Sequence, residues 1–137
     1  MNDVLLQKCA SIQRYIQRTK EEYANSGDNF EEDYTRQDAA ILNLLRACET
    51  CIDIANHLCR QNQLGIPASS RDSFDLLCQA QVINTSMANK LKLMTGFRNL
   101  AVHNYGKVDV PELERIIQEN LNDLEDFTKV VLLLAAG

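Results

Sequence analysis

Residues 41–59 read ILNLLRACETCIDIANHLC, and the spacing of their apolar residues is the strongest indication of the fold class. Apolar residues recur three or four positions apart, which predicts a helix rather than a strand. The apolar stripe is wide, so we expect this helix to be buried on more than one side. The stripe consists of Ile41, Leu44, Leu45, Cys48, Cys51, Ile52, Ala55, Leu58 and Cys59.

The segment before this stretch predicts a first amphipathic helix. The breaker sequence Asn25-Ser26-Gly27-Asp28 should end it. Thr35 followed by Asp38 resembles a capping box, so we expect the second helix to begin there. The apolar residues of the first helix are Leu5, Cys9, Ile12, Ile16 and Tyr23.

A short helix is predicted after the second one. Gly65-Ile66-Pro67 interrupts the helical pattern, because glycine and proline both disfavour a helix interior. Ser69 or Ser70 can then cap a short helix that reaches Leu77.

Two more long helices complete the chain. Asn84 or Thr85 opens one, and Asn104-Tyr105-Gly106 is a plausible stop for it. Asp109 and Pro111 suit the start of the last helix. Its near-heptad stripe consists of Leu113, Ile117, Leu124, Phe127, Val131 and Leu134. With no competing strand pattern, the sequence predicts one all-α domain over residues 1–137, an antiparallel bundle of four main helices plus a short helix.

The composition narrows the class of protein. No window of the 137 residues approaches the roughly 18 consecutive apolar residues of a membrane span, so we expect no membrane association. The first residues lack the charged-then-apolar layout of a secretory signal. Five cysteines are an odd number, unlike a secreted disulfide framework. We therefore expect a cytoplasmic protein with reduced thiols.

Charge is distributed unevenly along the chain. The net charge is −5, which by itself argues against binding nucleic acid. Between residues 76 and 108, however, there is no acidic residue, and Lys90, Lys92, Arg98 and Lys107 contribute +4. The pattern predicts a locally cationic site, although a chance gap in the acids remains an alternative.

The stretch Arg98-Asn99-Leu100-Ala101-Val102-His103-Asn104-Tyr105 combines three reactive side chains. Arginine is a permanent cation suited to phosphate, histidine titrates near neutral pH, and a tyrosine hydroxyl can be modified. Arg98 and His103 are five positions apart, which on a continuous helix separates them by about 140°. They could cooperate if the helix ended before His103, or if two subunits joined their motifs across a two-fold axis. We prefer the second geometry.

This stretch resembles the R-x4-H-x-Y signature of HepT-like proteins, which are toxins of the HEPN superfamily. The resemblance spans nearly the whole chain and includes residues 51–57, 65–67, 70–74 and 96–100. It implies a HEPN-like fold, a homodimer and a metal-independent endoribonuclease that acts on RNA without a cofactor. In that chemistry the RNA 2′-hydroxyl attacks the adjacent phosphate. His103 would act as general acid or base, and Arg98 would bind the scissile phosphate.

The resemblance also implies a partner, a cognate minimal nucleotidyltransferase that serves as antitoxin. Such a partner transfers AMP to the tyrosine of the signature, which is Tyr105 here. The added bulk and negative charge would stand where RNA phosphate must bind. We regard Asn104, Lys90, Lys92 and Lys107 as candidates for positioning the substrate.

A second group of polar residues lies on the predicted second helix. Cys48, Cys51, His57 and Cys59 suggest zinc, but they share one helix and span about 16 Å, too far for one tetrahedral site. We therefore expect no metal site and assign the cysteines to the core. Asp53 and His57 are four apart and could support the site indirectly.

Two other functions stay open at this point. The same helical dimer could be a non-catalytic module that binds a nucleotide or substrate for a nucleotidyltransferase. A purely structural bundle is the third possibility, and it would leave the acid-free segment and the R-x4-H-x-Y spacing as coincidences.

Overall fold

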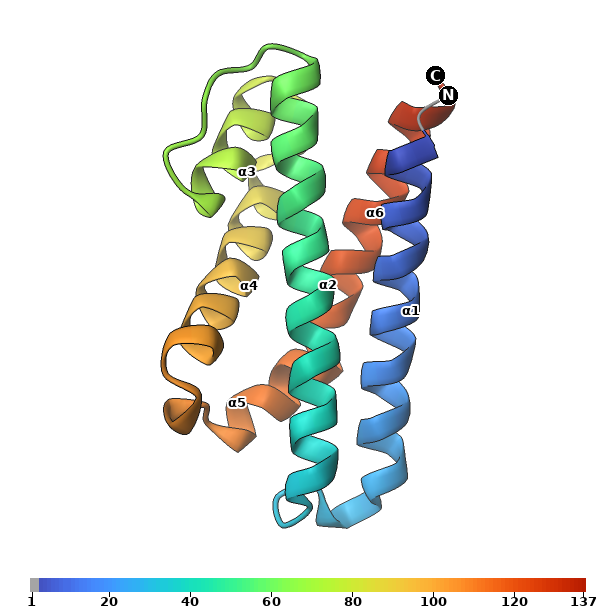
Figure 1. The fold of residues 1–137 in the computed structure, drawn as a ribbon, viewed down its shortest axis with the longest axis vertical. Coiled ribbons are helices and arrows are strands. Elements are labelled where there is room, and N and C mark those ends of the chain that lie inside the picture. Colours follow the sequence, from blue (N-terminus) through green and yellow to red (C-terminus); the bar gives the residue numbers. More distant parts are fainter. Residues whose placement is uncertain (1–2) are drawn as a thin grey trace.

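The computed structural model describes residues 3–137, so the first two residues of the predicted domain lie outside it. Helices α1 (Asp3–Ser26) and α2 (Tyr34–Gln61) pack side by side along most of their length (Figure 1). Helices α3 (Ser70–Gln79) and α4 (Thr85–His103) pack on another side of α2. The chain returns through α5 (Val110–Arg115) and α6 (Leu121–Ala136), which brings both termini to one end of the bundle. Residues 3–137 contain no strand, so the predicted all-α bundle is confirmed.

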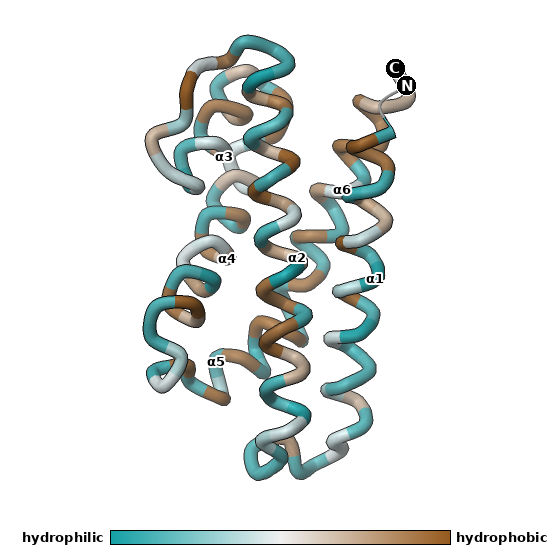
Figure 2. Tube along the Cα trace, viewed as in Figure 1, coloured by the Kyte–Doolittle hydropathy of each residue, from teal (hydrophilic) through white to brown (hydrophobic). Residues whose placement is uncertain are grey.

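Helix α2 is the centre of the core, as its wide apolar stripe predicts. Eight of the nine stripe residues are buried, and Leu45 is partly exposed. Hydrophobic and hydrophilic positions alternate along the long helices (Figure 2), and α2 contacts α1, α3, α4 and α6. Burial on several sides therefore follows from the sequence of this helix.

Polar side chains at the helix starts accept hydrogen bonds from backbone N–H groups that have no partner within the helix. Ser69, Asn84 and Asp109 cap α3, α4 and α5, as predicted. The predicted start of α2 at Thr35 is wrong, because Asp33 accepts the Arg36 N–H at 3.1 Å. Asp33 is preferred since it lies three residues before the N–H that its carboxylate reaches.

Replacing Asp33 by alanine should therefore lower the free energy of unfolding by about 1 kcal/mol. Thr35→Ala should change it by less than about 0.5 kcal/mol, because Thr35 lies inside the helix and is exposed. Asp33→Asn should retain most of the stability, since asparagine caps equally well. Chemical denaturation of the three variants measures these differences. A larger loss of unfolding free energy for Thr35→Ala than for Asp33→Ala would instead support Thr35 as the capping residue.

The last predicted helix is interrupted. Residues Ile116–Asn120 form a π-helical turn between α5 and α6, so the prediction of one uninterrupted α-helix is wrong. A π turn inserts extra backbone and rotates the buried face, and α5 accordingly runs at an angle to α6 in Figure 1. Five of the six stripe residues are buried on the two sides of this turn, whereas Leu134 is 46% exposed.

Two local features complete the description. Gly65 has φ +126°, a conformation that side-chain-bearing residues rarely adopt, which explains the break after α2. Within residues 3–137, none of the helices combines the length and the apolar character needed to cross a bilayer.

Candidate active site

The R-x4-H-x-Y stretch occupies the end of α4 and the turn after it. Helix α4 continues through His103, and Asn104 leaves the helical region with φ −152°. The Asn104 N–H still bonds to the Leu100 carbonyl at 2.8 Å. Residues Tyr105–Lys107 then form a single 3₁₀ turn. The predicted end of the helix is confirmed. Asn104 is the residue at which the helix ends, and Gly106 does not adopt the positive φ of a glycine cap.

Arg98 is held against α2. Its Nε lies 3.4 Å from Oε1 of Glu49, and the same carboxylate oxygen accepts Nη2 at 3.4 Å. Nη1 donates to Asn99 Oδ1 at 3.0 Å. Nε is buried yet has no hydrogen bond of good geometry. The guanidinium is therefore fixed in place with donor capacity left for a phosphate.

His103 lies on another side of the same helix. Because α4 is helical up to and including His103, the separation of about 140° from Arg98 remains. The alternative in which the helix ends before His103 is therefore wrong. His103 is exposed, whereas the Arg98 side chain is only 27% exposed. This separation on one helix agrees with the other predicted geometry, in which two chains join their motifs.

Tyr105 connects the turn after α4 to the start of α2. Its hydroxyl donates a hydrogen bond to Oδ1 of Asp38, and the side chain stays 47% exposed. Partial burial and the neighbouring Asp38 carboxylate raise the pKa of Tyr105 to about 12. A hydroxyl that is accessible and oriented by a carboxylate suits a modification site.

The predicted cationic patch is largely neutralised by the fold. Lys90 pairs with Asp123 at 3.7 Å and Lys92 pairs with Asp75 at 2.9 Å, and Arg98 pairs with Glu49. These acids come from α6, α3 and α2, outside the acid-free segment. The two lysines therefore link helices, and only Lys107, exposed beside Tyr105, has no ion pair within residues 3–137.

Asp53 and His57 lie further along α2. Asp53 is 61% exposed and pairs with Lys8 of α1 at 3.7 Å. His57 is eight residues beyond Glu49, about 12 Å along the helix axis. Neither residue is brought to the Arg98 contact, so we assign both to the fold.

The cysteines do not assemble a metal site. Among residues 3–137, no three His, Cys, Asp or Glu side chains are placed to hold one ion. Cys48 and Cys51 are buried, and burial raises the pKa of Cys48 to about 12 and that of Cys51 well above its ordinary value. Such thiols stay protonated and behave as small apolar side chains.

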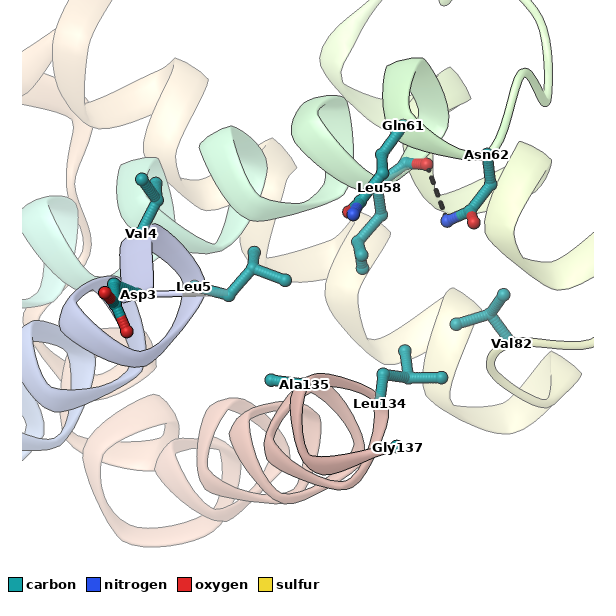
Figure 3. Close-up of a pocket in the computed structure, with 10 residues that line it drawn as sticks. All are labelled: Asp3, Val4, Leu5, Leu58, Gln61, Asn62, Val82, Leu134, Ala135 and Gly137. Atoms are coloured by element: carbon teal, nitrogen blue, oxygen red, sulfur yellow. Dashed lines mark hydrogen bonds between the residues drawn. The ribbon is translucent and has the colours of Figure 1, made fainter. Parts of the chain in front are cut away.

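A cavity of about 560 Å³ lies at the other end of the bundle, where the termini meet (Figure 3). Its lining comes from the ends of α1, α2 and α6 and from the loop before α4. Its lining includes Asn62, whose side-chain amide donates to the Leu58 backbone carbonyl, but none of the candidate active-site residues. The cavity therefore does not mark the chemistry at the end of α4.

Two residues of the site were missed by reasoning from the sequence. From the sequence, Asp38 was assigned only to a helix cap, and Glu49 was assigned no role. The signal was available: they are eleven positions apart, which places them on one face of α2 about 16 Å apart. Two acids on one face of α2 can contact polar side chains of a helix that packs against that face. Here that helix is α4, with the turn after it.

Comparison with known proteins adds independent information. A family model described as "Ribonuclease HepT-like" matches residues 12–131. The mRNA nuclease HepT of Shewanella oneidensis is 48% identical over 131 residues, which are 96% of this chain and 98% of that protein. Both similarities extend over most of the helical bundle and are not confined to the signature.

Solved structures agree. The tri-AMPylated Shewanella oneidensis HEPN toxin in complex with MNT antitoxin superposes with a TM-score of 0.92 and 47% identity, over 97% of this chain and 99% of that one. A toxin–antitoxin crystal structure with AMP-PNP superposes with a TM-score of 0.90 and 46% identity, over 96% and 99% of the two chains.

Proposed function

The chain belongs to the HepT-like ribonuclease family, and from this membership we propose that it is a cytoplasmic toxin that cleaves RNA without a metal ion. The RNA 2′-hydroxyl is the nucleophile, so no metal-activated water is needed. His103 moves the proton, and Arg98 binds the scissile phosphate and the charge that develops on it. The family match over residues 12–131 carries the proposal. The separation of Arg98 from His103 on an unbroken helix favours a composite site made by two chains.

A homodimer would form next to the end of α4. Leu42 of α2 and Val102 of α4 are each 47% exposed. By helical periodicity, Leu42 follows Asp38 on the same face of α2 and Val102 follows Arg98 on α4. The two apolar residues thus lie between the Arg98–Glu49 and Tyr105–Asp38 contacts. A second copy would cover them and bring its own His103 toward the first Arg98.

The same site explains how the toxin is neutralised. A minimal nucleotidyltransferase antitoxin transfers AMP to Tyr105, two residues from His103. The relative that supports this step is an AMPylated toxin bound to its antitoxin. The added phosphate carries negative charge and would repel RNA beside Asn104 and Lys107, which we retain as substrate-positioning residues.

Mixed dimers test the composite site. Arg98→Ala and His103→Ala chains, each inactive alone, should recover up to about half of the wild-type cleavage when they are co-expressed with different tags and the heterodimer is purified. In such a dimer one chain supplies Arg98 and the other supplies His103. Cleavage of a labelled RNA in EDTA is the measurement. A purified heterodimer as inactive as the two homodimers would contradict the composite site, and cleavage abolished by EDTA in the wild type would contradict the metal-free mechanism.

A further inference from the structure

Tyr105 differs from the other three tyrosines of the chain. Tyr34 is more exposed, at 73%, but no hydrogen bond from its hydroxyl is found within residues 3–137. Tyr23 does donate to a carboxylate, that of Glu114 at 3.1 Å, but it is only partly exposed and packs edge-on against Phe30. Tyr15 is only partly exposed, and no hydrogen bond from its hydroxyl is found within residues 3–137. Among the described residues, exposure together with a carboxylate acceptor is therefore specific to Tyr105.

A tyrosine hydroxyl is a poor nucleophile until it loses its proton. Burial and Asp38 raise the pKa of Tyr105 to about 12, so only about one molecule in 10⁵ carries the phenolate at pH 7. A reaction that waited for this minor form would be slow. The proton must instead leave during the attack, and this requires an acceptor within hydrogen-bond reach.

Resting on the proposed AMP transfer to Tyr105, we propose that Asp38 is the general base for that transfer, held ready by the hydrogen bond that joins the turn after α4 to α2. The Tyr105 oxygen attacks the α-phosphorus of a nucleoside triphosphate, and the new oxygen–phosphorus bond forms as the bond to the β-phosphate breaks. Pyrophosphate leaves, and the phenolic proton passes to Oδ1 of Asp38 and then to solvent. The toxin chain thus supplies part of the machinery that silences it.

Three other ionisable residues are neighbours of Tyr105 or Asp38 along the chain. His103 and Lys107 flank Tyr105 along the chain, and Arg36 on α2 is engaged with Glu22 at 2.6 Å. Only Asp38 accepts a hydrogen bond from the Tyr105 hydroxyl among the described residues. His103 is the competing base, so the experiment is made in chains that lack it.

The test compares Asp38→Asn, Asp38→Glu and Glu32→Gln, each combined with His103→Ala. Purified chains are incubated with the MNT antitoxin of Shewanella oneidensis, Mg²⁺ and ATP, and AMP addition is followed by intact-protein and peptide mass spectrometry. Asp38→Asn should lower kcat for the first transfer to Tyr105 by about 10²–10⁴-fold with little change in the KM for ATP. Asparagine can still accept the hydrogen bond but cannot accept the proton. Glu32→Gln removes an exposed acid near the start of α2 and should leave the rate unchanged.

A pH profile separates a base from a structural contact. Without the carboxylate, transfer depends on preformed phenolate, so the Asp38→Asn rate should rise tenfold per pH unit above neutrality and approach the parent rate. Asp38→Glu keeps a carboxylate and should recover part of the activity. Thermal unfolding of each chain verifies that it is folded.

Three results would overturn the proposal. Equal rates for Asp38→Asn and its parent would exclude a general base at this position. A pH-independent loss of rate would reduce Asp38 to a structural contact. A failure of the His103→Ala parent, with rapid modification of the wild type, would transfer the role to His103. If no chain acquires AMP on Tyr105, the proposed acceptor itself is wrong, which is a separate failure.

Discussion

Replacing His103 by alanine should lower the rate of RNA cleavage by about 10²–10⁴-fold, the contribution typical of a general acid or base. His103 is the last residue of α4 and is exposed, so its removal should leave the fold intact. The loss should therefore be in kcat, with RNA still bound. Cleavage of a labelled RNA under single-turnover conditions, with RNA binding measured in parallel, distinguishes a slower chemical step from weaker binding.

His57→Ala is the matched control, because His57 is the other histidine of the chain and lies about 12 Å along α2 from Glu49. It should cleave RNA at close to the wild-type rate. In a bacterial host, the wild type and His57→Ala should arrest growth, whereas His103→Ala should not. A folded His103→Ala chain that cleaves as fast as the wild type would exclude His103 as the general acid or base. A folded wild type that cleaves no RNA would favour the non-catalytic binding module.

The largest effect on stability should come from Phe127→Ala. Phe127 of α6 is fully buried and meets Phe74 of α3 edge-on, with ring centroids 5.8 Å apart. Truncating a buried phenylalanine costs about 3–5 kcal/mol, through lost burial and the cavity that remains. For a chain of this length the melting temperature should fall by about 10–20 °C.

Leu133→Ala is the control for this prediction, since Leu133 lies on the same helix and is 76% exposed. Its free energy of unfolding should change by less than about 0.5 kcal/mol. The double variant Phe74→Ala/Phe127→Ala should lose less free energy of unfolding than the sum of the two single variants, because each single change already removes the same ring contact. Equal destabilisation by Phe127→Ala and Leu133→Ala would contradict the assigned core.

The helices were predictable because their determinants are local. The stripe of α2 is a period in the sequence, and Ser69, Asn84 and Asp109 cap the N–H groups of residues three positions later. The errors have local and distant causes. Asp33 competes with Thr35 over two positions, and only the backbone conformation decides between them. The π turn at 116–120 interrupts a segment whose apolar period in the sequence is that of a helix, and the period does not reveal it.

For the site, the residue types that stand together could be read directly from the chain. The R-x4-H-x-Y spacing is part of the sequence. Local helix geometry then gives the end of α4 at Asn104 and the separation of Arg98 from His103. These are short-range properties of one segment.

Tertiary structure decided what those residues touch. Glu49 holds Arg98, Asp38 accepts the Tyr105 hydroxyl, and Asp75 and Asp123 occupy the lysines that the sequence offered to RNA. Each partner lies at least 17 residues away along the chain and arrives only when the helices pack. Electrostatic interactions depend on distance in space, so an acid-free stretch of sequence can become a paired surface in the fold.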